Sequence, residues 1–324
     1  MMDWRAERDR TLLALERETR PQARAEAAEL LVQIAAEDPS RASEFTEVLA
    51  RLLADAQGEV RRAGIGLATL VLSAEELPEM LTARLADADI GVRLEATGRI
   101  ADLALPQLRG ALARMLEDPV PEIRFEAARG MAALKHSAGL EILIAALDDA
   151  GLRFRALGAL AELGDAKALP AVKKFFSGWL VPAFERTQAA GVLARLGEAE
   201  GVEYLLKRTQ KKWSADRALA VELCGEVKVP GSLERLRSIL QDPKDPCRGA
   251  AARGLGRLGD PQALPWLLAL MEDTGAPEDF RLDAVDGVWR LGLPEGQARV
   301  RAIASTFTSP EAREELAELL QEKP

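Results

Sequence analysis

Apolar residues recur along most of this chain at spacings of three and four, which is the periodicity of a helix with one buried face. The segment 123–134 shows the pattern clearly, because Ala127, Met131 and Leu134 follow one another at those intervals. Alternation of β-branched and polar residues, which would indicate a half-buried strand, is absent. The pattern therefore predicts an all-α protein.

The same helical segment recurs nine times, at intervals of 29 to 37 residues. In each copy an arginine is followed after three positions by a small residue, and then by two mostly aliphatic residues at further spacings of four and three. We call this pattern the repeat frame. Its arginines are Arg24, Arg61, Arg93, Arg124, Arg153, Arg186, Arg217, Arg248 and Arg281, with a weaker copy at Arg313. Ala127 and Ala251 are expected at the packed face between helices, and Arg129 on the exposed face.

A second amphipathic segment precedes each copy of the frame, as in 169–176 and 264–271. Proline near the start of these segments suits a first helical turn, and Asp-Pro or Gly-Asp turns separate the helices. Each repeat is therefore expected to be an antiparallel helical hairpin. About ten stacked hairpins form an α-solenoid, a single elongated and curved domain. We expect an N-terminal capping hairpin at 1–36, regular repeats over 37–291 and a C-terminal capping hairpin at 292–324.

The frame resembles the HEAT repeat, especially the short form of the phycobilisome-lyase family. The likeness covers roughly residues 20–305. It rests on segments of the form Asp-x-x-x-x-(Val/Ile)-Arg-x-x-Ala, followed by Leu-Gly-Asp-Pro-x-Ala-Leu-Pro linkers, and the best copies are 118–134 and 258–273. In HEAT proteins this aspartate and this arginine form a ladder of ion pairs between successive repeats.

The resemblance implies that this ladder is interrupted in the middle of the chain. An aspartate lies six residues before the frame arginine at Asp55, Asp87, Asp118 and Asp242. The matching positions of the sixth and seventh copies hold Leu180 and Lys211 instead. We therefore expect the ladder to be lost in these two repeats.

The composition limits which metal-binding, cofactor-binding and catalytic sites the chain could form. A single histidine, His136, excludes a multi-histidine metal centre, and it falls in a turn where a surface role is expected. Cys224 and Cys247 are expected to be buried structural thiols. Gly254, Gly256 and Gly259 match the G-x-G-x-x-G spacing, but they lie inside the repeat frame, which favours tight helix packing over a dinucleotide site. We expect no metal, no cofactor and no enzymatic activity.

Charge and hydropathy bear on partners and location. The net charge of −9 opposes general nucleic-acid binding, which requires a basic surface. No apolar run approaches the roughly 18 residues of a membrane span. The first ten residues are charged where a signal peptide would be apolar, and two cysteines are too few for a disulfide framework. These features predict a cytoplasmic protein.

The centre of the chain departs from the rest. Residues 165–217 carry a balance of +4, whereas the remainder carries −13. Trp179 and Trp213 fall in successive turns between helices, where core packing does not require them. The candidate partner-binding edge comprises Lys173, Lys174, Trp179, Lys207, Lys211, Lys212 and Trp213. The alternative, which we weigh equally, is that the tryptophans fold back over the core and that the lysines are merely solvated.

These observations predict a non-enzymatic scaffold or adaptor that binds a protein or an extended peptide along a solenoid surface. An acidic segment of a partner fits the central basic stretch. The alternative that the resemblance implies is an accessory or lyase-type subunit acting on a pigment or a modified protein. Abundant alanine and arginine are typical of bacteria with GC-rich genomes and weigh against a phycobilisome role. Nucleic-acid binding by the central stretch alone is a third reading.

Overall fold

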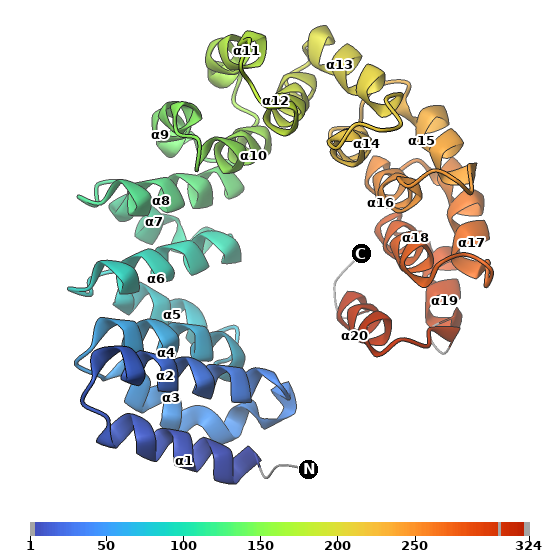
Figure 1. Ribbon diagram of the computed structural model, residues 1–324. Helices are drawn as coiled ribbons and strands as arrows, with labels where there is room; N and C mark the ends of the chain where they lie inside the picture. The colour runs from blue at the N-terminus through green and yellow to red at the C-terminus, as the bar shows by residue number, and fades with distance from the viewer. Residues whose placement is uncertain (1–3, 304–305, 321–324) are drawn as a thin grey trace. The chain divides into compact units, whose positions relative to one another are not determined.

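The computed structural model describes residues 4–303 and 306–320, and the regular secondary structure in these ranges is helical throughout (Figure 1). The all-α prediction is therefore confirmed. Twenty α-helices lie in the described residues, and they alternate between a first and a second helix of each repeat, so the expected number of about ten repeats also holds. The chain divides into two compact units, residues 1–146 and 147–324.

Unit 1 contains four helical hairpins and one further first helix. Successive odd- and even-numbered helices pack against each other within each hairpin. The helices are α1 (Trp4–Arg17), α2 (Pro21–Ala36), α3 (Thr46–Leu53), α4 (Gly58–Val71), α5 (Glu76–Arg84), α6 (Ile90–Leu103), α7 (Arg109–Met115), α8 (Pro121–Ala133) and α9 (Leu140–Ala145).

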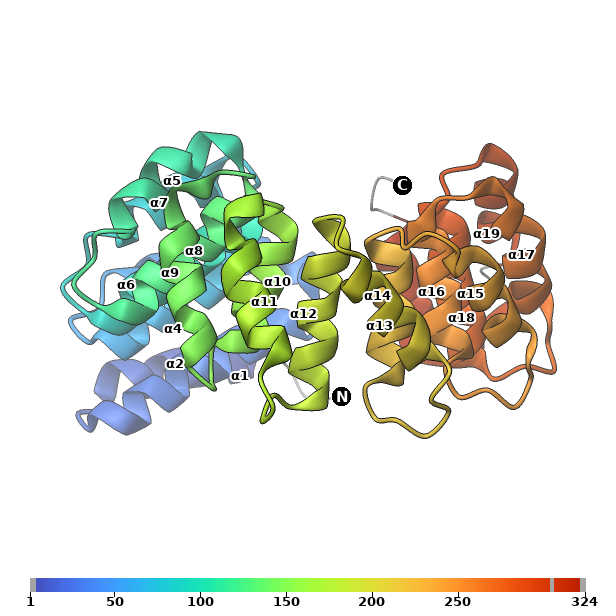
Figure 2. The ribbon, with the colours of Figure 1, turned by 90° about the horizontal axis from the view of Figure 1, so that it is seen from above.

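Unit 2 begins with a second helix and continues with five hairpins. The helices are α10 (Arg153–Leu163), α11 (Leu169–Ser177), α12 (Ala183–Arg195), α13 (Ala199–Thr209), α14 (Arg217–Glu226), α15 (Ser232–Gln241), α16 (Arg248–Leu258), α17 (Leu264–Glu272), α18 (Glu278–Arg290), α19 (Pro294–Ile303) and α20 (Pro310–Leu319). Within each unit the second helices stack on one another, and the first helices lie beside them (Figures 1 and 2).

The second helices of unit 2 cross their neighbours very closely, because glycines lie at the crossings. A Cβ atom at Gly225 would lie 2.0 Å from the carbonyl oxygen of Gly254, and one at Gly256 would lie 2.5 Å from the Cα of Gly287. Gly259 follows α16 in the left-handed conformation, with φ of +76°. The glycine-rich segment therefore serves helix packing, as expected.

The small residues of the frame lie in the core. Ala127 and Ala251 are fully buried, in α8 and α16 respectively. Arg129 does not behave as expected. It is partly buried, and its guanidinium forms ion pairs with Asp102 at 2.7 Å and with Glu126 at 2.9 Å. The exposed position predicted for it is wrong, because the neighbouring second helix α6 brings a carboxylate against its side.

Enlarging Ala251 to leucine is expected to lower the free energy of unfolding by about 1–3 kcal/mol, because the added atoms must displace a close-packed neighbour. Ala218→Leu, at an exposed position of α14, is the matched control. Urea denaturation of both variants measures the difference. Equal stability of the two would show that the frame alanine does not lie at a packed face.

The arginine–aspartate ladder is present in unit 1. Arg61 donates to Asp87 with Nε to Oδ2 at 2.8 Å, and Arg93 donates to Asp118 in the same way at 3.0 Å. Arg24 pairs with Asp55. Each of these aspartates also accepts the backbone N–H two residues later, so it fixes the turn in which it lies. The ladder thus joins successive repeats through their turns.

Unit 2 breaks the ladder where Leu180 and Lys211 replace the aspartate. Arg153 pairs with Glu185 instead, at 3.3 Å. Arg186 donates to backbone carbonyls and has no carboxylate partner among the described residues. The expected interruption is therefore confirmed at Arg186, whereas Glu185 keeps an ion pair between the fifth and sixth repeats.

The role predicted for Asp242 is wrong. Asp242 pairs with Lys212 at 3.2 Å, and the ladder partner of Arg217 is Asp245. The turn of residues 242–247 is shaped so that the carboxylate three residues before Arg248, not the one six residues before it, meets the frame arginine of the preceding repeat.

Candidate functional site

Trp179 and Trp213 are the most exposed large apolar side chains among the described residues, with 87% and 92% of their surfaces exposed. Trp179 lies in the loop between α11 and α12, and Trp213 in the loop between α13 and α14. Both loops project from the same edge of unit 2, at the bottom of Figure 2. The alternative in which the indoles fold back over the core is therefore wrong.

Two further apolar side chains extend this surface. Leu180 is 73% exposed beside Trp179, and Phe184 is 46% exposed in the first turn of α12. The sequence analysis did not place either residue in the candidate site. Leu180 carried a signal, because an apolar residue replaces a turn aspartate there. Phe184 carried none, because its position in the helix does not by itself distinguish a core face from an exposed one.

Hydrogen bonds from Arg186 fix the loop that carries Trp179. Arg186 donates to the carbonyl oxygens of Phe176 at 2.9 Å and of Gly178 at 2.7 Å. The ring of Phe176 in turn meets Tyr204 of α13 edge-on, with 5.3 Å between centroids. The frame arginine, which lacks a carboxylate in this repeat, thus fixes the end of α11 and the start of the loop.

The loop that carries Trp213 is held by a buried carboxylate. Asp216 is fully buried and accepts hydrogen bonds from Arg208 Nε at 2.7 Å, from Thr187 Oγ1 at 2.5 Å and from Ser214 Oγ. Burial acts to raise the pKa of Asp216, but the hydrogen bonds from these three donors outweigh it and lower the pKa to about 2. The carboxylate is therefore charged at neutral pH and joins α12, α13 and the loop.

The candidate lysines fall into two groups. Lys174, Lys207 and Lys211 are exposed, and their ammonium groups have no ion pair among the described residues. Lys173 is paired with Glu198 at 2.7 Å, and Lys212 with Asp242 at 3.2 Å. We refer to this set of residues, Trp179, Leu180, Phe184, Trp213 and the five lysines, as the tryptophan edge. It combines exposed indoles on anchored loops with uncompensated positive charge.

The remaining candidate chemistry is structural. Burial raises the pKa of the Cys224 thiol to about 12 and also raises the pKa of Cys247, so neither is a ready nucleophile. His136 is exposed, and its Nδ1 accepts the N–H of Ala138 at 3.3 Å, which is the capping role that Asp165 has in the next repeat.

In the described ranges, no three or more His, Cys, Asp or Glu side chains are grouped to hold a metal ion. Among residues 4–303 and 306–320, none of the helices has the length and hydrophobicity that a membrane crossing requires.

The stacked hairpins, the buried frame alanines and the ladder agree with a family comparison. A model of HEAT repeats matches residues 78–155 and 214–287. These two stretches of the chain are HEAT repeats. The tryptophan edge lies between the two matched stretches, where the sequence departs from the repeat frame. No curated protein matches the chain.

Solved structures share the helical architecture at low sequence identity. The phycocyanin lyase complex of CpcE and CpcF from Nostoc sp. PCC7120 is 20% identical over 71% of this chain and 94% of that chain, with a TM-score of 0.48. Human deoxyhypusine hydroxylase in complex with glycerol is 18% identical over 76% and 95%, with a TM-score of 0.33. Kap121p is 12% identical over 99% of this chain and 41% of its own, with a TM-score of 0.41.

Proposed function

We propose that this protein is a non-enzymatic scaffold that binds a partner protein at the tryptophan edge. The observation that carries the proposal is the near-complete exposure of Trp179 and Trp213 on loops that buried contacts hold in place. Exposed aromatic residues are costly in water unless a partner covers them, and tryptophan is the residue most enriched among binding hot spots. Because the loops are already ordered, binding would lose little conformational entropy.

The positive charge of the tryptophan edge favours a partner with acidic residues. Lys174, Lys207 and Lys211 lie in the helices and loops that carry the indoles and have no ion pair among the described residues, so a segment that combines apolar residues with aspartate or glutamate complements the surface. We propose that the partner contributes such an acidic segment. The two buried cysteines form no disulfide, which agrees with a cytoplasmic location.

Trp179→Ala and Trp213→Ala are each expected to weaken partner binding by about 2 kcal/mol or more, roughly thirtyfold, because each removes a large apolar anchor. The partner is isolated once by affinity capture on the wild-type protein and then titrated calorimetrically against each variant. Ile90→Ala is the control, because Ile90 is an exposed apolar residue of unit 1.

Lys211→Glu is expected mainly to slow association and to reduce its salt dependence.

The same experiment separates the alternatives. Unchanged binding by both tryptophan variants, or an equal loss with Ile90→Ala, would overturn the proposal. A captured pigment-bearing protein would favour the accessory lyase-type function. Loss of all binding after nuclease treatment would favour nucleic acid as the partner.

A further inference from the structure

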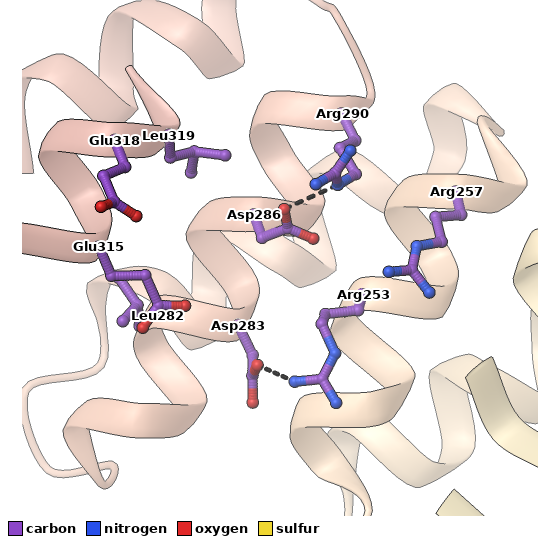
Figure 3. A pocket seen from close by; sticks show the side chains of 9 residues that line it. All are labelled: Arg253, Arg257, Leu282, Asp283, Asp286, Arg290, Glu315, Glu318 and Leu319. Atoms are coloured by element: carbon purple, nitrogen blue, oxygen red, sulfur yellow. Dashed lines mark hydrogen bonds and ion pairs between the residues drawn. The ribbon is translucent and has the colours of Figure 1, made fainter. Parts of the chain in front are cut away.

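A pocket of about 220 Å³ lies between the second helices α16, α18 and α20 of unit 2, away from the loops of the tryptophan edge. Figure 3 shows Glu315 and Glu318 of α20 along one side, with Leu282 and Leu319 beside them. Its remaining lining residues are Arg253, Arg257, Asp283, Asp286 and Arg290. The pocket therefore combines charged groups of both signs with an apolar wall.

Carboxylates already engage the three arginines of the pocket. Arg253 lies between Asp283 and Glu222 and forms an ion pair with each. Arg290 donates to Asp286 Oδ1 at 2.7 Å, and Arg257 lies 3.9 Å from Glu222. The positive charge of the pocket is thus compensated within the fold.

Asp283 and Asp286 thus have ion-pair partners, but part of the negative charge of the pocket is not compensated. Asp286 Oδ2 is buried and has no hydrogen-bond donor. Glu315 and Glu318 form no ion pair among the described residues, and both face the pocket in Figure 3. Burial raises the pKa of Asp283, and the neighbouring charges of Glu315 and Asp286 raise it further against the opposing effect of Arg253. The site therefore has unused capacity for a positive charge.

We propose that this pocket binds the side chain of an arginine or lysine presented by a peptide. The charged head of such a side chain donates to the exposed carboxylates of Glu315 and Glu318, while its methylene stem packs on Leu282 and Leu319. A bare metal ion fits less well, because no group of acidic side chains in the described residues is compact enough to hold one. An organic cation spans the separate carboxylates.

The probe is N-acetyl-arginine amide, and N-acetyl-citrulline amide is its uncharged counterpart of the same shape. Methyl groups of Leu282 and Leu319 serve as NMR reporters in protein carrying labelled leucine methyls. The arginine compound is expected to shift both signals in a saturable way, with little effect on other leucines. The citrulline compound is expected to leave them in place. Glu315→Gln combined with Glu318→Gln is expected to weaken binding at least tenfold.

Glu314→Gln is the matched control, because Glu314 lies on the same helix but does not line the pocket. Thermal melts check that the variants are folded. Equal shifts with citrulline, shifts spread over leucines throughout the chain, or an equal loss in Glu314→Gln would overturn the proposal. The pocket is independent of the tryptophan edge, so Trp213→Ala is expected to leave this titration unchanged, and failure of either proposal leaves the other standing.

Discussion

Replacing Asp245 with alanine is expected to lower the free energy of unfolding by about 3–5 kcal/mol, because it leaves a buried guanidinium without a counter-ion. Arg217 is 1% exposed and donates to both oxygens of Asp245, each at 2.7 Å, while its Nε donates to the carbonyl of Thr209 at 2.7 Å. Burial acts to raise the pKa of Asp245, but the hydrogen bonds and charge of Arg217 lower it overall. The carboxylate is therefore charged at neutral pH and compensates the arginine.

Asp242→Ala is the matched control for this prediction. Asp242 belongs to the same turn, but its ion pair with Lys212 is exposed, and such pairs contribute little to stability. Urea denaturation at neutral pH compares the two variants with the wild-type protein. A third protein, carrying Arg217→Met and Asp245→Leu together, is expected to recover most of the loss, since it removes both charges. Equal stability of Asp242→Ala and Asp245→Ala would show that burial of the pair has no energetic consequence.

The sequence predicts the repeat architecture because one frame is copied many times, and each copy reports the same physical requirement. A small residue must sit where two helices meet, and Ala127 and Ala251 are fully buried for that reason. The unit 1 ladder follows from the same regularity, since a constant turn places Asp87 and Asp118 against the preceding arginine.

The wrong predictions concern positions where the local structure differs from that of a regular repeat. The turn of residues 242–247 has its own shape, so the spacing rule selects Asp242 although Asp245 makes the contact. Arg129 lies on the side of its helix that an isolated hairpin would expose, but the preceding second helix, α6, covers that side. Neither of these two contacts can be predicted from the spacing of residues within one repeat.

Apart from Phe184, whose position carried no signal, the residues of the tryptophan edge were predictable because their signals are local: two tryptophans in turns, lysines nearby and a lost aspartate. The pocket of Figure 3 was not, because its lining comes from three repeats. In the sequence, Glu315 cannot be distinguished from a solvated residue of a charged helix, because only the fold brings α18 beside it. Which of the carboxylates lacks a partner depends on side-chain packing that no motif encodes.

Replacing Asp216 with alanine is expected to lower the free energy of unfolding by about 2–3 kcal/mol at neutral pH and also to weaken partner binding. The buried hydroxyl of Thr187 would lose its acceptor, and Arg208 would lose its charged partner. The pKa of Asp216 is about 2 in the folded protein, below its ordinary value of 3.8. Its stabilising effect is therefore fully present above about pH 4 and is lost as the pH falls toward 2. The linked change is about 2 kcal/mol.

The measurement is the difference in unfolding free energy between the wild-type protein and Asp216→Ala, determined by urea denaturation at several pH values from 7 to 2.5. Taking the difference removes the contribution of other carboxylates, so the gap is expected to shrink only at the acidic end. Thr187→Val, which deletes one donor and keeps the shape, is expected to cost about 1 kcal/mol. Because Asp216 fixes the loop that carries Trp213, its loss would also release that indole, and partner binding would weaken although no contact residue has changed. A gap independent of pH would show that Asp216 acts through packing alone, and full partner affinity in Asp216→Ala would show that Trp213 binds without an anchored loop.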